Sequence, residues 1–283
     1  MDEKAYLNLF ADDILITIED ENIYSAVTRL NVALNNACVW LRDNNLVVNC
    51  DKTKVMFFGV QEPNESLPAV ILSGKTLEVV NSIKYLGVII DKKLSFNLYA
   101  QQVIKKCTQK TSYFIRVSRS LNMKGRINVY KSIIAPHYRY CPTLLMYINK
   151  KDINKLQVQQ NRAMRCILKC NYYTPINLML DSLRFLSVKQ YLTYQTLCFI
   201  YKTDRRLVPM YLQRNLKSIA NVHDHETRGR DLFYVNKVNK ESTKNCIFYD
   251  GLVMFNNLPD NIKVSSNFCS FKEGLREYVR MNI

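Results

Sequence analysis

Two adjacent carboxylates, Asp12 and Asp13, interrupt an apolar segment at residues 7–18. Apolar residues alternate on both sides of the pair, which predicts a strand, a tight turn and a second strand; they are Leu7, Leu9, Ile14, Ile16 and Ile18. Two carboxylates at the tip of a buried hairpin repel each other and resist desolvation. Mg²⁺ takes oxygen ligands, and one or two carboxylates typically hold it to substrate phosphates. The pattern therefore indicates a site for Mg²⁺ or Mn²⁺, and the alternative is a polar turn with a capping Asp12 and a solvated Asp13.

Residues 19–91 supply the elements that would position this turn. Acids at 19–21 precede apolar residues at three- and four-residue steps, which predicts a helix from there to about residue 43. Residues 46–58 are consistent with two short strands around a polar loop, and residues 69–80 with a hairpin that turns at Ser73-Gly74. In the apolar segment that follows, Gly87 would let another backbone approach closely, and the alternative is a glycine at a strand bulge.

Length and composition narrow the class of protein. The chain has 283 residues, 48% of them hydrophobic, which suits one large or two smaller domains. Only 7 glycines favour helix over a turn-rich architecture. The sequence holds no uninterrupted apolar run long enough for a membrane span and no secretory signal, so we expect no membrane partner. Nine scattered cysteines suit reduced thiols, and we expect an intracellular protein, cytoplasmic or nuclear.

The charge of the chain is unevenly distributed. Residues 1–91 hold 13 acids and 7 bases, a net charge of −6. Because the whole chain has a net charge of +16, residues 92–283 carry +22. No acid occurs between Asp91 and Asp152, a stretch with 13 lysines and arginines. A solvated helical face normally mixes both signs, so this stretch indicates a polyanionic partner, most simply a nucleic-acid backbone and next an anionic lipid. The bases expected to contact it are Lys105, Lys106, Lys110, Arg116, Arg119, Lys124 and Arg126.

Helical periodicity dominates the same part of the chain. The spacing predicts a helix from Ser95 to about residue 121 and a second at residues 124–134 that Pro136 stops. Further helices are predicted at residues 153–167, from Thr174-Pro175, from Ser187 to about 204, and near the C-terminus from residue 268. The fold class is therefore α+β: a small antiparallel sheet with a helix in residues 1–90, then a mostly α-helical region in residues 91–283.

Several motifs resemble those of reverse transcriptases. Phe10-Ala11-Asp12-Asp13 resembles the (Tyr/Phe)-x-Asp-Asp box of that family, and the order of elements after it resembles the LINE-type, jockey-like branch. Residues 130–141, residues 156–165 and Phe255-Asn256-Asn257-Leu258-Pro259 are similar to segments that recur there, the last with Phe255 in place of Trp. The resemblance implies an RNA-directed DNA polymerase, with a partial palm in residues 1–90 and a thumb-like region in residues 91–283.

The resemblance also implies roles for single residues. Asp12 and Asp13 would be catalytic metal ligands, and Lys52 would lie near the leaving pyrophosphate, with its neighbour Lys54 as the alternative. The primer grip would be Tyr85, Leu86 and Gly87. The partners would be an RNA template and a DNA primer, and the cofactor would be Mg²⁺ or Mn²⁺.

One part of the family's catalytic centre has no counterpart in the sequence. The family takes a further aspartate from an earlier strand, and the eleven residues before Asp12 cannot supply that strand or the fingers. We therefore expect a truncated polymerase that is inactive alone and binds metal weakly. The alternative is a non-catalytic, basic nucleic-acid-binding remnant of such an enzyme.

Overall fold

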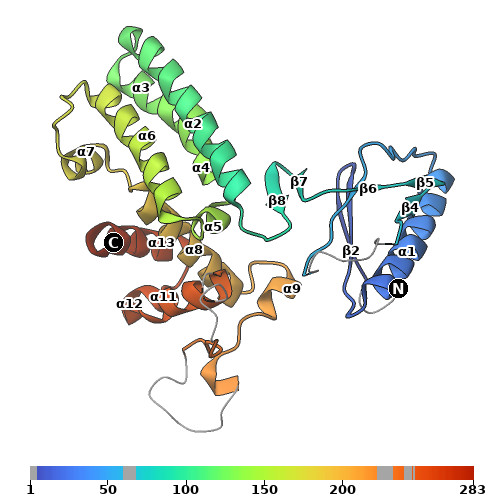
Figure 1. The fold of residues 1–283 in the computed structure, drawn as a ribbon. Helices are drawn as coiled ribbons and strands as arrows, with labels where there is room; N and C mark the ends of the chain where they lie inside the picture. Colours follow the sequence, from blue (N-terminus) through green and yellow to red (C-terminus); the bar gives the residue numbers. More distant parts are fainter. Residues whose placement is uncertain (1–4, 60–67, 222–231, 239–243, 245) are drawn as a thin grey trace. The chain divides into compact units, whose positions relative to one another are not determined.

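The computed structural model describes residues 5–59, 68–221, 232–238, 244 and 246–283. The chain forms two compact units, Met1–Ser95 and Phe96–Ile283. The first combines short strands with one long helix, and the second is helical (Figure 1). The predicted α+β class is confirmed. No helix in the described part of the chain is long and apolar enough to cross a membrane.

The first unit begins with the predicted hairpin. Strands β1 (Ala5–Phe10) and β2 (Asp13–Ile18) pair antiparallel, with Leu7 opposite Ile16 and Leu9 opposite Ile14. Because the side chains of directly opposed residues lie on the same face, these four residues form one apolar surface.

Helix α1 (Ile23–Asp43) follows, and the side chain of Asn22 caps it by accepting from the backbone N–H groups of Tyr24 and Ser25. The acids at 19–21 precede this cap instead of forming the first turn. Asp20 accepts hydrogen bonds from the Ser25 hydroxyl (2.8 Å) and from Arg29 (2.8 Å), so it fixes the start of the helix from outside.

The remaining strands of this unit are short and form separate pairs. Among the described residues, β3 (Lys54–Val55) pairs parallel with β6 (Glu78–Val79), whereas β4 (Ile71–Leu72) with β5 (Lys75–Thr76) and β7 (Ser82–Tyr85) with β8 (Val88–Asp91) pair antiparallel. The predicted turn at Ser73-Gly74 joins β4 to β5, with φ of 50° and 78°. Of residues 46–58, predicted to form two short strands around a loop, Lys54–Val55 forms a strand and residues 46–49 form none. The N–H of Leu46 bonds back to the carbonyl of Leu41, and the carbonyl of Asn49 accepts from the N–H groups of Lys52 and Thr53, so both ends of the segment are engaged locally.

A small core holds α1 to these strands. It consists of buried residues from one face of the helix and from the segments around β3 to β6; they are Val27, Leu34, Val55, Val70, Leu72 and Leu77. Asn31 reinforces this contact, because its side chain accepts from the N–H of Ile71 (2.8 Å) and donates to the carbonyl of Ala69 (3.2 Å).

The second unit is built from helices of very different length. The long ones are α2 (Asn97–Val117), α6 (Lys150–Leu168), α8 (Val188–Asp204) and α13 (Phe268–Asn282), and each matches a predicted helix. Ser187 caps α8 in a capping box with Gln190. The shorter helical segments are η1 (Ser118–Ser120), α3 (Met123–Val129), η2 (Tyr130–Ile134), α4 (Ala135–Arg139), α5 (Pro142–Leu145), α7 (Ile176–Leu183), α9 (Met210–Gln213), η3 (Ile219–Asn221), η4 (Ile247–Gly251), α11 (Leu252–Asn256) and α12 (Asp260–Lys263).

Pro136 does not stop the second predicted helix, so that expectation is wrong. Residues 130–134 form a π-helical turn, in which the N–H of Ala135 bonds to the carbonyl of Tyr130. Proline in a regular α-helix lacks one hydrogen bond and clashes with the preceding turn. The wider π-turn absorbs both effects, and the chain continues as α4 through Pro136 to Arg139.

Candidate functional site

The acidic pair lies at the turn of the first hairpin. Residues Ala11 and Asp12 connect β1 to β2, and Asp13 is paired with Phe10 as the last register position. Ala11 has a φ of 52°, the left-handed region that only a minority of non-glycine residues adopt. Both carboxylates are exposed, and they are adjacent in the chain.

The hairpin itself is more exposed than the sequence predicts. We expected a buried hairpin, but Leu9 is 61% exposed and Phe10 is 63% exposed. The hairpin contacts α1 mainly through β2. Leu9 lines a groove that remains between the hairpin and the helix, and Phe10 adjoins the turn, so α1 covers neither side chain.

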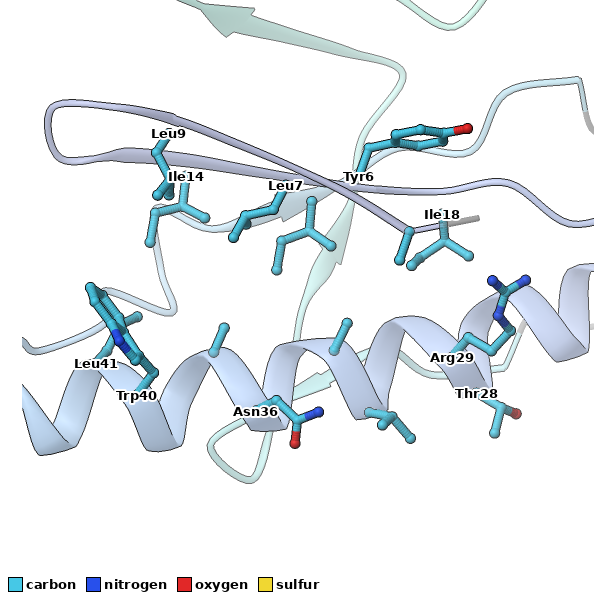
Figure 2. Close-up of a pocket in the computed structure, with 15 residues that line it drawn as sticks. Tyr6, Leu7, Leu9, Ile14, Ile18, Thr28, Arg29, Asn36, Trp40 and Leu41 are labelled. Atoms are coloured by element: carbon cyan, nitrogen blue, oxygen red, sulfur yellow. The ribbon is translucent and has the colours of Figure 1, made fainter. Parts of the chain in front are cut away.

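A groove remains even on the inner face. Figure 2 shows the apolar side chains of the hairpin above α1, with open space between the two layers. The cavity has a volume of about 540 Å³. Its lining comes from alternate hairpin residues and from one side of α1, and includes Leu7, Leu9, Ile14, Val32, Ala37 and Trp40.

The acidic turn could supply some of the ligands of a divalent cation, but not all of them. Mg²⁺ requires six oxygen ligands in near-octahedral geometry, and two carboxylates supply a minority of them. In the described residues, no group of three or more His, Cys, Asp or Glu side chains forms a candidate metal cluster. Water or a phosphate-bearing substrate would have to complete the coordination.

The loop with Lys52 is a well-defined turn. Asn49 organises it, because its side-chain oxygen accepts from the N–H of Lys52 (3.1 Å) and its carbonyl accepts from the Thr53 hydroxyl (2.9 Å). The ammonium of Lys54 forms an ion pair with Glu78 on the neighbouring strand. Lys52 is exposed, so of the two lysines it is the one whose charge is available to a substrate.

Gly87 lies in a tight turn and not at a strand bulge. Leu86 and Gly87 connect β7 to β8 with φ of 46° and 85°, the pattern of a two-residue hairpin turn with both central residues left-handed. Glycine adopts this conformation without strain, which explains its presence. The turn presents its backbone at the tip of this hairpin.

The structure does not link the candidate residues to one another directly. Among the described residues, no hydrogen bond or ion pair joins Lys52 or Gly87 to Asp12 or Asp13.

The predicted basic surface is largely exposed. Six of its seven bases are solvent-exposed on α2, η1 and α3: Lys105, Lys106, Lys110, Arg116, Arg119 and Lys124. The acids at the two ends of the acid-free stretch are both engaged. Asp152 is 2% exposed and accepts from Gln101, Asn149 and Lys155, and Asp91 accepts from the Ser95 N–H and hydroxyl.

Arg126 does not belong to this surface. It is 7% exposed, and its guanidinium donates to the carbonyl of Cys166 in α6 (2.9 Å). Helix C-terminal carbonyls lack partners within the helix, and a buried arginine satisfies one here. The charge pattern could not distinguish this structural arginine from its exposed neighbours.

His137 is a residue that the sequence reasoning missed. It lies in α4, which packs on α2, and it is partly buried. Burial lowers the pKa of His137, and the positive charges of Lys106 and Lys110 lower it further. A histidine inside an acid-free, lysine-rich stretch was the signal that could have drawn attention to it.

Comparison with known proteins decides the relationship. The chain is 26% identical over 224 residues to "Probable RNA-directed DNA polymerase from transposon BS" of Drosophila melanogaster, a match that covers 76% of this chain and 25% of that protein. It is 26% identical over 175 residues to "RNA-directed DNA polymerase from mobile element jockey" of the same species, covering 61% of this chain and 19% of that protein. These polymerases are homologues of the chain.

A third homologue has the same character. "Probable RNA-directed DNA polymerase from transposon X-element", also of Drosophila melanogaster, is 25% identical over 173 residues, which are 60% of this chain and 19% of that protein. The resemblance to LINE-type, jockey-like polymerases is thereby confirmed. The chain spans a quarter or less of the length of these polymerase homologues. No family model and no solved structure matches it.

Proposed function

We propose that the chain provides the acidic hairpin and the basic helical region of a LINE-type RNA-directed DNA polymerase. The observation that carries the proposal is the exposed Asp12-Asp13 pair at a tight hairpin turn, in a chain whose homologues are such polymerases. Residues 1–90 would belong to the palm and residues 91–283 to the thumb-like region.

Each candidate residue has a distinct role in this proposal. Asp12 and Asp13 would hold Mg²⁺ or Mn²⁺, which supplies charge stabilisation for the attacking and leaving oxygens of phosphoryl transfer. Lys52, fixed by the Asn49 turn, would stabilise charge on the leaving pyrophosphate. The hairpin tip at Tyr85, Leu86 and Gly87 would approach the primer with its backbone.

The basic surface would hold the RNA template and DNA primer. Lys106 and Lys110 are four residues apart on α2 and therefore neighbours on one side of the helix, and Lys105 and Arg116 are eleven apart, close to three full turns. Contacts from such residues to phosphates do not depend on base sequence. A surface of this kind can grip a duplex and still let it slide.

A second candidate function rests on the same surface without the metal. The acid-free stretch would make the chain a nucleic-acid-binding protein even if Asp12 and Asp13 did no catalysis. Binding of primer–template without any contribution of the acidic pair would favour this candidate.

Metal binding in the presence of nucleic acid tests the first candidate. We expect Mn²⁺, followed by electron paramagnetic resonance, to bind the chain weakly by itself and more tightly once primer–template phosphates complete the coordination. Asp12→Asn/Asp13→Asn should abolish the increase. The matched control, Asp43→Asn/Asp260→Asn, removes two exposed carboxylates from elsewhere and should leave it intact. An increase that survives Asp12→Asn/Asp13→Asn would refute the metal site.

Primer extension is the companion measurement. We expect the 283-residue chain alone to extend no primer, because two carboxylates cannot coordinate a pair of catalytic ions. Extension that disappears in Asp12→Asn would overturn this expectation and would establish the polymerase activity directly.

A salt titration of duplex binding tests the basic surface. Each phosphate that a protein neutralises on B-DNA lowers log K by about 0.9 per unit of log salt concentration. Lys105→Ala/Lys106→Ala/Lys110→Ala should weaken binding similarly for all sequences and flatten this slope. The control, Lys189→Ala/Lys217→Ala/Lys237→Ala, removes three exposed lysines from outside the acid-free stretch. Equal slopes in the two triple variants would refute the proposed surface.

A further inference from the structure

Two tyrosines stand out on the surface of the helical unit, in the loop between α6 and α7. Tyr172 is 74% exposed and Tyr173 is 86% exposed. Their rings lie 5.7 Å apart between centres and nearly perpendicular, at 85°. Two adjacent aromatic rings of this exposure leave a contiguous apolar surface in water, and such a surface marks an interaction site more often than a single exposed side chain does.

The loop holds these rings in a defined arrangement. Arg165 of α6 donates from Nε to the carbonyl of Tyr172 (3.0 Å), and its guanidinium carbon lies 4.9 Å from the centre of the Tyr172 ring. Asn171 accepts from the N–H of Tyr173 through its side chain (3.3 Å) and from the N–H of Thr174 through its carbonyl (3.1 Å). Because the loop is already ordered, binding costs less of the protein's own conformational entropy.

The surroundings of the tyrosines are positively charged. Residues 153–180 contain no acid and four bases: Lys155, Arg162, Arg165 and Lys169. Lys169 is exposed and ends α6 in the left-handed conformation, immediately before the tyrosine loop. The next acid, Asp181, forms an ion pair with Arg280 (2.7 Å). Of the four bases, Lys155 forms an ion pair with Asp152 (2.8 Å), whereas Arg165 and Lys169 form no ion pair within the described part of the chain. The loop therefore combines exposed aromatic rings with two cations that no acid neutralises there.

This combination is the one that recognises unpaired nucleotides. Single strands are bound by aromatic side chains on which bases stack and by lysines and arginines that contact the phosphates. In a duplex, neighbouring base pairs cover the faces of the bases, so stacking on tyrosine requires an unpaired base or a strand end. An anionic membrane would use the lysines, but it offers no planar group to the rings.

We propose that the α6–α7 loop is a binding site for unpaired nucleotides, with bases stacked on Tyr172 and Tyr173 and phosphates contacted by Arg165 and Lys169. The site is distinct from the exposed bases of α2 and α3, and it does not depend on the metal site of the acidic hairpin. The proposed polymerase function assigns no role to this loop.

An abasic oligonucleotide separates stacking from charge. Fluorescence anisotropy would compare a labelled single-stranded RNA of twelve nucleotides with a strand of the same length that lacks its bases. We expect the wild-type chain to prefer the strand with bases. Tyr172→Leu/Tyr173→Leu should weaken binding of that strand about fivefold or more, the loss typical of one stacked base, and should leave the abasic strand unaffected. Thermal melting should be unchanged, because both side chains are exposed.

The matched control is Tyr211→Leu, which removes a 68% exposed tyrosine from α9. It should bind both strands as the wild type does. Lys105→Ala/Lys106→Ala/Lys110→Ala should weaken both strands by the same factor, so a failure of the basic surface and a failure of the tyrosine loop give different results. Equal wild-type affinity for the two strands would overturn the proposal. Full affinity of Tyr172→Leu/Tyr173→Leu for the strand with bases would also overturn it. Binding to vesicles of anionic lipid is measured in parallel, and a loss of affinity for vesicles alone would contradict the proposal as well.

Discussion

Gln160 donates a hydrogen bond to the hydroxyl of Tyr130 (3.2 Å), across 30 residues of sequence and in the interior of the helical unit. The same amide nitrogen donates to the carbonyl of Leu186 (2.8 Å), and the hydroxyl of Tyr130 shares a further hydrogen bond with that of Tyr138. Tyr130 and Tyr138 come from residues 130–141 and Gln160 comes from residues 156–165, which are two of the segments that resemble the polymerases. The two segments are therefore parts of one buried polar network, and their polar residues have a structural role.

Gln160→Leu should destabilise the helical unit. The substitution leaves the carbonyl of Leu186 buried without this donor, and it removes one partner of the Tyr130 hydroxyl. A buried polar group that loses its partner costs about 1–3 kcal/mol. We expect a lower melting temperature by circular dichroism. Gln109→Leu on the exposed side of α2 is the control and should melt as the wild type does; equal melting temperatures in the two variants would contradict the role of Gln160.

Asn256→Ala should also destabilise, whereas Asn257→Ala should not. The side chain of Asn256 accepts from the N–H of Phe233 (2.9 Å) and donates to its carbonyl (2.9 Å), so it takes the place of a neighbouring strand. Its neighbour Asn257 is exposed. We expect a loss of about 1–3 kcal/mol in the free energy of unfolding for the first variant. Urea unfolding of the two variants side by side measures the difference, and a larger loss in Asn257→Ala would show that this hydrogen-bond pair is not what stabilises the segment.

The sequence predicted most of the regular elements, and the reason is periodicity. Alternation at residues 7–18 gave the first hairpin, and three- and four-residue steps gave the long helices, because each element must bury one face. The Ser187 cap was predictable because a serine hydroxyl accepts from the first N–H groups of a helix, and the turn at Ser73-Gly74 because glycine adopts the positive φ that a two-residue hairpin turn requires. Short elements such as the strands of two residues have no period, so they could not be predicted with correct bounds.

The burial of polar and charged residues was not predictable in the same way. Arg126 has the same charge as its exposed neighbours, and only the packing of α3 on α6 shows that it is buried. The exposure of the first hairpin has the opposite cause, because its apolar pattern says that one face seeks a partner but not how much of it α1 covers. The exposed Tyr172-Tyr173 pair is likewise a property of the loop and not of a pattern.

Arg126→Ala should lower stability without a specific effect on nucleic-acid binding. The variant leaves the carbonyl of Cys166 without its arginine donor inside the protein. Hydrogen bonds to charged groups contribute about 1.5–3 kcal/mol, so the melting temperature should fall. At a temperature where the variant is folded, the salt slope of duplex binding should equal that of the wild type. A flattened slope with unchanged melting would instead place Arg126 on the binding surface.

Acid should destabilise the helical unit through His137. Because burial and the charges of Lys106 and Lys110 lower the pKa of His137 in the folded protein, unfolding takes up a proton at this position. Its contribution to stability is therefore complete above the ordinary pKa of 6.5 and is lost as the pH falls from there through the lower folded value. His137→Gln removes this titration, so its melting temperature should fall less than that of the wild type between pH 7.5 and 5.5. Parallel curves for the two proteins would show that His137 titrates normally.

The groove below the acidic hairpin should accept a larger side chain from α1. Ala37 lines a cavity of about 540 Å³, so leucine at this position should extend into space that is already open. Each additional buried methylene contributes about 0.8 kcal/mol, and alanine and leucine have similar helix propensities. We therefore expect Ala37→Leu to raise the free energy of unfolding of the first unit by about 1–2 kcal/mol.

Trp40 provides the measurement for this substitution. It is the single tryptophan of the chain and lines the same groove, so its fluorescence in urea reports unfolding of the first unit alone. Ala26→Leu, on the same helix but outside the lining of the groove, is the matched control and should change stability less. Since leucine gains only where apolar neighbours surround it, a stabilisation confined to Ala37→Leu would show that the apolar faces of the hairpin and α1 are incompletely packed. Destabilisation by Ala37→Leu relative to Ala26→Leu would mean that the groove is already closed in solution.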